Sequence, residues 1–248
     1  MNHKGKNALI TGGTRGIGRA IALRLGREGA ELVLNYLDNE EAAAKTLEEV
    51  RAAGGRAHLV KANLGDPDQV KALAEEAVKI LGHVDYLVHC AALGNFKRVS
   101  ELRANQWDLS MEINVKSLLA LAQKLLKSMR RGSAIVALSS SGAVRYVPNY
   151  GAIGISKAAL EALVRYLACE LIGSGIRVNA VQAGPVDTAS LAMFPHQEER
   201  KKEMVFRTPA GRLGVPEDLA GLVSFLLSED AGWIIGQTVV ADGGLSLI

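Results

Sequence analysis

The sequence predicts one α/β domain spanning residues 1–248, in which helices cover both faces of a doubly wound, seven-stranded parallel sheet. Short apolar runs alternate with longer amphipathic runs along the whole chain, as expected for strands joined by crossover helices. Several apolar runs are almost continuously hydrophobic, which is typical of parallel strands buried on both faces. No linker, repeat or low-complexity tract interrupts the 248 residues, 48% of which are hydrophobic, so a single sizeable core is expected.

Seven strands are predicted, in order, at NALIT (7–11), ELVLNY (31–36), RAHLVKA (56–62), VDYLVHC (84–90), SAIVALS (133–139), IRVNAV (176–181) and QTVVAD (237–242). The amphipathic runs between them predict helices at 17–29, 39–53, 67–81, 105–130, 150–173 and 217–228. Because strands alternate with helices, right-handed crossovers between parallel strands are expected. Folds of this kind bind ligands at the carboxyl ends of their strands.

Charge and cysteine usage narrow the class of protein. The net charge of +3 arises from 29 basic and 26 acidic side chains, which is too balanced for a general nucleic-acid binder but leaves room for a local basic patch. Cys90 and Cys169 lie in apolar contexts, so we expect buried, reduced thiols. The start, MNHKGKNALITGG, has no apolar stretch of signal-peptide length, and no apolar run reaches the ~20 residues of a membrane span. A cytoplasmic protein without a metal site is expected.

A glycine-rich turn directly follows the first predicted strand. It reads TGGTRGIG, contains Gly12, Gly16 and Gly18, and precedes an apolar-periodic helix. Glycine lets the backbone approach a pyrophosphate, and the free N–H groups and dipole of a helix N-terminus favour its charge. Glycines also serve ordinary turns, but a strand on one side and a helix on the other favour a dinucleotide site.

The spacing Gly-x3-Gly-x-Gly, with TG before it, closely resembles the short-chain dehydrogenase/reductase family. Further matches follow in the family's order: Asn114 in MEINVKS, Ser139-Ser140 after the fifth strand, Lys157, NAVQAGPVDT at 179–188 and the terminal GQTVVADGG. The resemblance covers essentially the whole chain. It implies one Rossmann-fold domain, a nicotinamide cofactor, a homotetramer and a supporting role for Asn114. The cofactor-binding residues that it implies are Gly12, Thr14, Arg15, Gly16, Ile17, Gly18, Asn35, Asn63, Leu64, Ala91, Ala92, Lys157, Gly184, Val186 and Thr188.

The end of the second strand favours NADPH over NADH. NAD enzymes commonly carry an acid there for the adenosine ribose, whereas this chain reads Leu34-Asn35-Tyr36. Arg15 is able to pair with a 2′-phosphate through its planar guanidinium; the alternative is a solvated loop arginine. Asp38, Glu40 and Glu41 follow closely and would repel a phosphate if they faced it.

Three segments depart from the family's pattern. Where the family has Asn-Asn-Ala-Gly after the fourth strand, this chain has His89-Cys90-Ala91-Ala92. His89 is a candidate base, but a strand-end histidine is more often packed and hydrogen-bonded. Small Ala91 and Ala92 still allow a cofactor to approach the backbone. Gly184-Pro185 inverts the usual Pro-Gly, and Asn63-Leu64 replaces Asp-Val beside the adenine.

The reacting residues are expected near the start of the predicted helix 150–173, which connects the fifth and sixth strands. Ser140 lies 17 residues before Lys157, which matches the family's active-site serine and lysine. The family's tyrosine stands four residues before the lysine, but here that position is Ile153, and Tyr150 stands seven before. A Tyr-x6-Lys pattern, together with RYVPNYGAIGISKAALEALVRYLACEL, VDTASLAMFP and RTPAGR, resembles enoyl-acyl-carrier-protein reductase III, the NADPH-dependent bacterial type.

That resemblance implies that Tyr150 and Lys157 are the catalytic pair. Lys157 would bind the nicotinamide ribose and bring the pKa of Tyr150 nearer neutrality. Ser140 is a candidate substrate contact; Tyr146 is either another or a packing residue. If residue 150 is helical, a three-residue shift moves its Cα by ~4.5 Å and turns it by about 60°. Such a donor suits an enolate oxygen, which lies further from the hydride-accepting carbon than a ketone oxygen does.

The expected reaction is therefore NADPH-dependent reduction of trans-2-enoyl-acyl-carrier-protein thioesters in fatty-acid synthesis. A short-chain carbonyl reductase acting on 3-oxoacyl or other ketones is the alternative, and a non-catalytic dinucleotide-binding regulator is a third possibility. Residues 189–212 are expected to form a mobile substrate lid. Its basic residues, Arg200, Lys201 and Lys202, with Lys97 and Arg98, either meet an acidic carrier protein or form a solvated helix face.

Overall fold

A computed structural model describes residues 1–189, 191 and 197–248, and of Gln197 only the backbone. Its strands are β1 Asn7–Thr11, β2 Glu31–Tyr36, β3 Arg56–Lys61, β4 Tyr86–His89, β5 Ala134–Ser140, β6 Arg177–Ala183 and β7 Thr238–Ala241. Its α-helices are α1 Gly16–Arg27, α2 Glu40–Ala52, α3 Pro67–Leu81, α4 Ala104–Met111, α5 Ser117–Leu125, α6 Gly151–Leu171, α7 Gln197–Arg207 and α8 Pro216–Leu227. The sequence predicted each of these strands and most of these helices.

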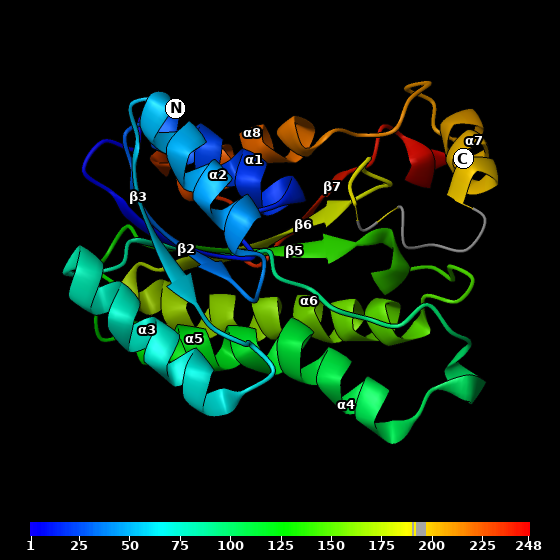
Figure 1. Ribbon diagram of the computed structural model, residues 1–248, viewed down its shortest axis with the longest axis horizontal. Coiled ribbons are helices and arrows are strands. Elements are labelled where there is room, and N and C mark those ends of the chain that lie inside the picture. Colours follow the sequence, from blue (N-terminus) through cyan, green and yellow to red (C-terminus); the bar gives the residue numbers. More distant parts are fainter. Residues whose placement is uncertain (190, 192–196) are drawn as a thin grey trace.

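The strands form one parallel sheet between two layers of helices. Within the described ranges the sheet has seven strands in the order β3-β2-β1-β4-β5-β6-β7, and every pairing is parallel. Helices α1, α2 and α8 cover one face, and α3, α5 and α6 cover the other (Figure 1). Each face has its own cluster of buried aliphatic side chains. The predicted doubly wound fold is confirmed.

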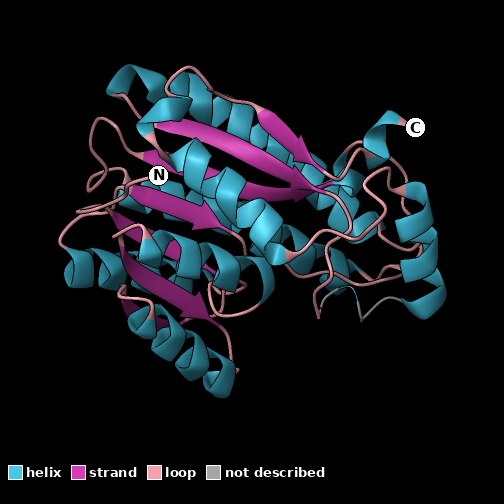
Figure 2. Ribbon diagram, turned by 90° about the horizontal axis from the view of Figure 1, so that it is seen from above, coloured by secondary structure: helices cyan, strands magenta, loops and turns pink. Residues whose placement is uncertain are grey.

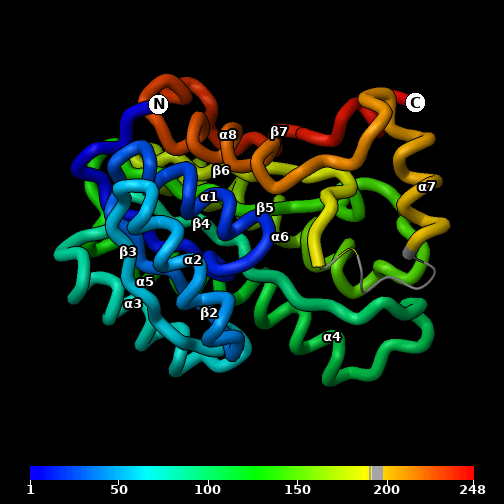
Figure 3. The backbone as a smooth tube through the Cα atoms, turned by 45° about the horizontal axis from the view of Figure 1, so that its top comes forward, coloured from blue at the N-terminus to red at the C-terminus, as the bar shows by residue number. Residues whose placement is uncertain are grey.

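The reversal of strand order at β1 and β4 defines the ligand-binding edge. The strands all point toward the end of the molecule where the C-terminus lies (Figure 2). Helices α4 and α7 project beyond the sheet at that same end (Figure 3). Ligands of doubly wound sheets bind outside the carboxyl ends of the strands, at the point where the order reverses. The predicted site residues therefore converge here.

Four features differ from the sequence prediction. The predicted helix 105–130 is two helices, α4 and α5, joined by a π-helical turn at Glu112–Lys116. Tyr150 precedes α6 with φ −112° and ψ 10°, so it is not helical and the condition for the rotation argument is not met. Cys169 is exposed rather than buried, and Cys90 is only partly buried. Part of the predicted lid is the helix α7; residues 190 and 192–196 lie outside the described residues.

No helix within the described part of the chain has the length and apolar character needed to cross a bilayer.

Candidate active site

The glycine-rich turn between β1 and α1 has a geometry that larger residues do not fit. Gly12 and Gly16 adopt φ values of 60° and 50°, in the left-handed region that favours glycine. A Cβ on Gly18 would lie 2.1 Å from the Gly12 carbonyl oxygen, so the first turn of α1 packs directly on the loop. The α1 N-terminus therefore presents its free N–H groups beside an unobstructed backbone, which suits a pyrophosphate.

Neighbouring strands hold this turn in place. Thr11 Oγ1 accepts hydrogen bonds from the N–H groups of Cys90 and Ala91, at 3.1 and 3.2 Å. A Cβ on Gly12 would lie 3.0 Å from the Ala91 Cα, so the turn packs against the backbone after β4. On the other side, a Cβ on Gly16 would lie 3.5 Å from the Thr188 methyl group. The structure thus brings together the predicted cofactor-binding residues that follow β1, β4 and β6.

Other predicted cofactor residues lie around the same turn. Thr14 is buried, and its carbonyl accepts a hydrogen bond of 2.8 Å from Thr46 Oγ1 on α2. Ile17 is partly buried in the first turn of α1. Ala92 is exposed beyond β4. Past β6, Val186 forms an isolated bridge with Gly214.

A close backbone approach also fixes the segment after β6. A Cβ on Gly184 would lie 2.7 Å from the Asp242 Cα. A side chain at this position would therefore separate the chain after β6 from the chain after β7.

At the adenosine end, two predicted residues face the protein interior. Asn35 is buried; its Nδ2 donates to the Ala62 carbonyl at 3.0 Å and its Oδ1 accepts from Gly12 N–H at 3.4 Å. The Leu64 side chain is also buried in the core. The Asn35 side chain supports the glycine turn from behind, and its predicted part in cofactor binding stays a prediction.

The remaining residues at the adenosine end include a cationic side chain that is exposed to solvent. Asn63 is partly buried, and its Oδ1 accepts a hydrogen bond of 2.9 Å from Gly65 N–H. The Arg15 side chain is exposed. The Glu40 carboxylate pairs with Lys61 at 2.9 Å. Because Glu40 is paired with a lysine, the acidic residues after β2 should repel a phosphate less than the sequence alone suggested.

Asn114 joins three elements from within the π-helical turn. It is fully buried; its Oδ1 accepts from Leu93 N–H, and its Nδ2 donates to the Leu93 carbonyl, both at 2.9 Å. Nδ2 also lies 2.8 Å from Ser156 Oγ on α6. π-helical turns occur frequently at functional sites. This one lets a single amide tie the segment after β4 to the helix that carries Lys157.

His89 is packed and neutral rather than a base. Ser117 Oγ donates to the Ile113 carbonyl at 2.6 Å, so its lone pair faces His89 Nε2 at 2.8 Å, and Nε2 carries the proton. Burial, followed by the charge of Lys157, lowers the pKa of His89 to about 3. Nδ1 has no hydrogen-bond partner among the residues that the structure describes. His89 is therefore a packed, hydrogen-bonded residue, and its ring supports the π-helical turn through Ser117.

Lys157 is 4% exposed and lies on the sheet-facing side of α6. Its Nζ donates to the Leu138 carbonyl of β5 at 2.7 Å. Burial lowers the pKa of Lys157 to about 8, and electrostatic interactions with Cys90 and Glu161 oppose that shift. Glu161, one helical turn further along, is 6% exposed and accepts a hydrogen bond of 2.5 Å from Ser139 Oγ. Sequence reasoning missed Glu161; its spacing of four residues from Lys157 was the available signal.

Tyr150 meets Ser140 despite its displaced position in the sequence. The two hydroxyl groups are hydrogen-bonded, and this bond partly offsets the rise in the Tyr150 pKa that burial causes. The expectation that Lys157 brings this pKa toward neutrality is therefore wrong for this structure. The Tyr150 ring lies 6.1 Å from the Phe96 ring, and a Cβ on Gly142 would lie 2.6 Å from Tyr150 Cδ1.

The usual tyrosine position is filled by an aliphatic side chain. Ile153 is 7% exposed and packs against the backbone after β4, where a Cβ on Gly94 would lie 1.9 Å from Ile153 Cγ1. Tyr146, in contrast, is 85% exposed, so its packing interpretation is wrong. The only tyrosine hydroxyl that the described residues bring to Ser140 comes from Tyr150.

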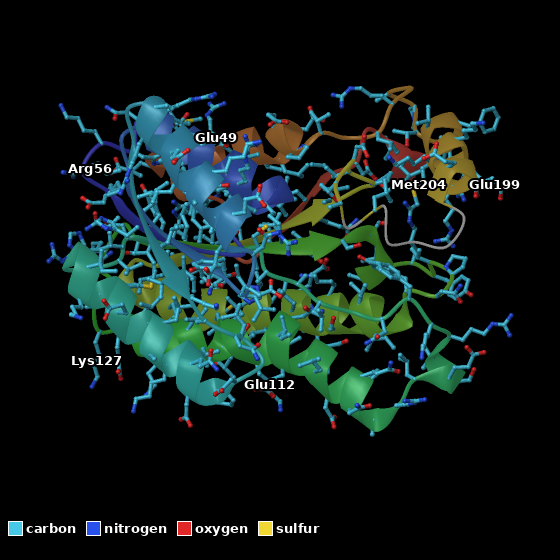
Figure 4. All side chains as sticks on the ribbon, viewed as in Figure 1. Glu49, Arg56, Glu112, Lys127, Glu199 and Met204 are labelled. Atoms are coloured by element: carbon cyan, nitrogen blue, oxygen red, sulfur yellow. The ribbon has the colours of Figure 1, made fainter. Side chains whose placement is uncertain are left out.

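Helix α7 is attached to loops on both sides of this site. Lys201 Nζ lies 2.9 Å from Asp187 Oδ1, next to Thr188. Arg200 Nη2 donates to the Pro148 carbonyl at 3.4 Å, two residues before Tyr150. Figure 4 places α7, with Glu199 and Met204 labelled, at the end of the molecule opposite Arg56 and Lys127. Two of the basic residues expected to meet a carrier protein thus contact this chain itself.

Known proteins are similar to this chain over nearly its whole length. A family model described as "Enoyl-(Acyl carrier protein) reductase" matches residues 12–246. The chain is 32 to 35% identical, over 98% or more of its length, to several solved reductases. One, a short-chain dehydrogenase from Burkholderia cenocepacia in complex with NADP, has a TM-score of 0.93 and 30% identity, covering 99% of this chain and 100% of that one. The chain belongs to the short-chain dehydrogenase/reductase family.

Two curated relatives of this short-chain dehydrogenase/reductase carry different activities in their names. It is 42% identical over 243 residues to 1-cyclohexenylcarbonyl-CoA reductase of Streptomyces collinus, covering 97% of this chain and 87% of that protein. It is 35% identical over 242 residues to 3-oxoacyl-[acyl-carrier-protein] reductase FabG of Staphylococcus aureus, covering 97% and 98%. The family and an oxidoreductase activity follow from these matches; the choice between a double bond and a ketone does not.

Proposed function

We propose that this short-chain dehydrogenase/reductase reduces the 2,3 double bond of trans-2-enoyl thioesters with NADPH. The observation that carries the proposal is the hydrogen bond between Tyr150 and Ser140, combined with Ile153 at the usual tyrosine position. A hydroxyl donor is retained at the site, but its side chain starts from the turn before α6 rather than from the helix.

The displaced donor suits the charge that develops during enoyl reduction. When hydride reaches the β-carbon of an enoyl thioester, negative charge appears on the thioester oxygen, several bonds away. A donor aimed at this enolate oxygen stabilises it as an oxyanion-hole group does. The raised pKa of Tyr150 keeps its hydroxyl protonated at neutral pH and therefore able to donate. Lys157 then contributes by binding the cofactor and by its positive charge.

The residues around the glycine turn fit NADPH, which supplies the hydride when bound. The close approach of Gly12 and Gly18 leaves a surface for the pyrophosphate, and exposed Arg15 supplies a cation for a 2′-phosphate. Ala91, Ala92, Gly184, Val186 and Thr188 would border the nicotinamide. The NADP named for the Burkholderia cenocepacia relative supports this assignment.

The proposed substrate is an acyl thioester carried by acyl carrier protein in cytoplasmic fatty-acid synthesis, and the proposed assembly is a homotetramer. The description of the matching family model supports a carrier-protein substrate. The name of the Streptomyces collinus relative supports reduction of an unsaturated acyl group but specifies coenzyme A. Residues 189–212, which include α7, remain the proposed substrate lid.

A second candidate is reduction of a 3-oxoacyl thioester or another ketone. The name of the Staphylococcus aureus relative favours it, and the paired hydroxyls of Ser140 and Tyr150 are also able to protonate a ketone oxygen. The two reactions differ in the distance between the carbon that accepts hydride and the oxygen that accepts a hydrogen bond.

One assay separates the candidates: NADPH oxidation with crotonyl thioesters of acyl carrier protein and of coenzyme A, beside the matching acetoacetyl thioesters. We expect kcat/KM for a crotonyl thioester to exceed that for acetoacetyl by at least about 100-fold, or about 2.7 kcal/mol. A preference for acetoacetyl would replace the proposal with the ketoreductase. NADPH binding without turnover of any of these substrates would favour a non-catalytic regulator.

A further inference from the structure

Helix α6 buries two opposite charges one turn apart, and neighbouring residues of β5 hold both. Lys157 donates to the Leu138 carbonyl at 2.7 Å, and Glu161 accepts from the Ser139 hydroxyl at 2.5 Å. The two charged side chains are 4% and 6% exposed. Side chains spaced four apart lie on the same face of a helix, with Cβ atoms about 5–6 Å apart. A carboxylate is therefore fixed beside the lysine at a depth where water screens it little.

Three titratable groups face Lys157: His89 at the end of β4, Cys90 after it, and Glu161 on α6. Burial lowers the pKa of His89 to about 3, so the imidazole is neutral at physiological pH. Burial raises the pKa of Cys90 to about 11, so its thiol is also neutral where Lys157 titrates. Of these three groups, Glu161 is the one that carries a carboxyl group, and its charge raises the pKa of Lys157.

We propose that Glu161 is a positioning residue that keeps Lys157 charged, and that Ser139 fixes the Glu161 carboxylate for this purpose. An ammonium group loses much of its hydration when it is buried and stays charged only where an opposite charge or strong acceptors compensate. The Leu138 carbonyl is one acceptor, and Glu161 adds the full charge. The inference rests on the cofactor-binding part of the proposed function and is independent of whether the substrate is an enoyl or a ketone.

The decisive variant is Glu161→Gln, which keeps the size of the side chain and an oxygen that accepts from Ser139 but removes the charge. The matched control is Glu170→Gln, at an exposed position further along the same helix. The first measurement is the titration of Lys157 in the cofactor-free protein by NMR of isotope-labelled lysine side chains, assigned with Lys157→Arg. The second is NADPH binding, followed by nicotinamide fluorescence across the same pH range.

We expect the Lys157 midpoint in Glu161→Gln to fall by about one pH unit or more, as loss of a nearby buried charge requires. From a starting midpoint near 8, a fall of one unit makes NADPH binding about fivefold weaker at pH 8 and leaves it nearly unchanged at pH 6, where Lys157 is charged in both proteins. Recovery at low pH is the outcome that a merely structural role of Glu161 does not produce. Glu170→Gln should behave as the unmodified protein.

An unchanged Lys157 midpoint in Glu161→Gln overturns the proposal, and so does weakening of NADPH binding by the same factor at pH 6 and pH 8. Should Glu161→Gln not fold, Ser139→Ala provides the test, because it retains the charge but releases the carboxylate. The Lys157 midpoint must then fall, and a constant midpoint counts against the proposal. Both measurements omit the acyl substrate, so failure of the enoyl reductase assignment would leave their interpretation intact.

Discussion

Replacing Tyr150 by phenylalanine separates its chemical role from its structural role. The ring contacts with Phe96 and Gly142 remain, and the change removes one hydroxyl and its hydrogen bond to Ser140. Loss of one such bond costs about 1 kcal/mol of stability. Loss of a positioned donor to a developing oxyanion lowers the rate on the order of 10²-fold or more, about 2.7 kcal/mol in transition-state free energy.

The assay for this prediction is NADPH oxidation with a crotonyl thioester, accompanied by NADPH binding and urea unfolding. Tyr150→Phe should bind NADPH with an affinity within about twofold of the unmodified protein while losing most of its turnover, since the lost contact acts in the transition state. Tyr146→Phe is the matched control, because it makes the same change four residues earlier at a side chain that is 85% exposed. Full crotonyl reduction by Tyr150→Phe would refute the reasoning and favour the ketoreductase.

The transplant Ile153→Tyr with Tyr150→Phe sharpens the test by restoring the family's usual spacing. Ile153 already abuts the backbone at Gly94, so a larger ring requires the segment after β4 to move, at a cost of about 1–3 kcal/mol. We expect the double variant to fold less stably and not to recover enoyl reduction. Recovery of crotonyl turnover would mean that the position of the hydroxyl is irrelevant to the choice of reaction.

Three further predictions concern the cofactor, α7 and the titration of Lys157. NADPH should be preferred over NADH by at least about tenfold in kcat/KM, about 1.4 kcal/mol. The variant Arg15→Ala should lose most of this preference because its KM for NADPH rises. Equal use of both cofactors by the unmodified protein would contradict the prediction. Lys201→Glu breaks the contact of α7 with Asp187 and should raise the KM for the acyl thioester severalfold. Adding Asp187→Lys should restore it, Lys127→Glu at the opposite end should do nothing, and an unchanged KM in Lys201→Glu excludes a role for the contact. Burial holds the pKa of Lys157 near 8 rather than 10.5, so between these pH values the unfolded chain binds more protons and stability rises with pH. Relative to Lys157→Met, the unmodified protein should gain up to about 1.4 kcal/mol per pH unit in this window, measured by urea unfolding, and a constant difference would contradict the lowered pKa.

The sequence was sufficient for the sheet and for the glycine turn because both depend on local patterns. Continuous apolar runs mark strands buried on both faces, and each predicted strand lies within three residues of the observed one at both ends. The glycine turn could be predicted equally well, because few residue types other than glycine adopt the positive φ values found at Gly12 and Gly16. The positions of Lys157 and Ser140 followed from family spacing rather than from local physics.

The π-helical turn could not be predicted from apolar periodicity. One extra residue in a turn shifts the helical phase by only about 100°. Aliphatic residues are spread through 105–130, so their pattern does not reveal a shift of this size. Asn114 is polar but fully buried, and its partners Leu93 and Ser156 lie on other elements. Only the assembled fold identifies them. Helix α7 was not predicted because its sequence is highly charged and its few apolar residues stand together near its C-terminal end.

The displaced tyrosine illustrates how a fixed partner preserves a site while its donor moves. Ser140 is the last residue of β5, so its hydroxyl is positioned by the sheet and is independent of where α6 begins. The turn before α6 is shaped by Asn149, whose φ of 60° is the only positive value at a non-glycine residue in the described ranges. Asparagine tolerates this conformation better than most residues do. Through this turn Tyr150 reaches Ser140 from outside the helix, while Lys157 stays in register with β5. The change of donor direction therefore requires no change in the helix, in the sheet or in the position of the cofactor-binding lysine.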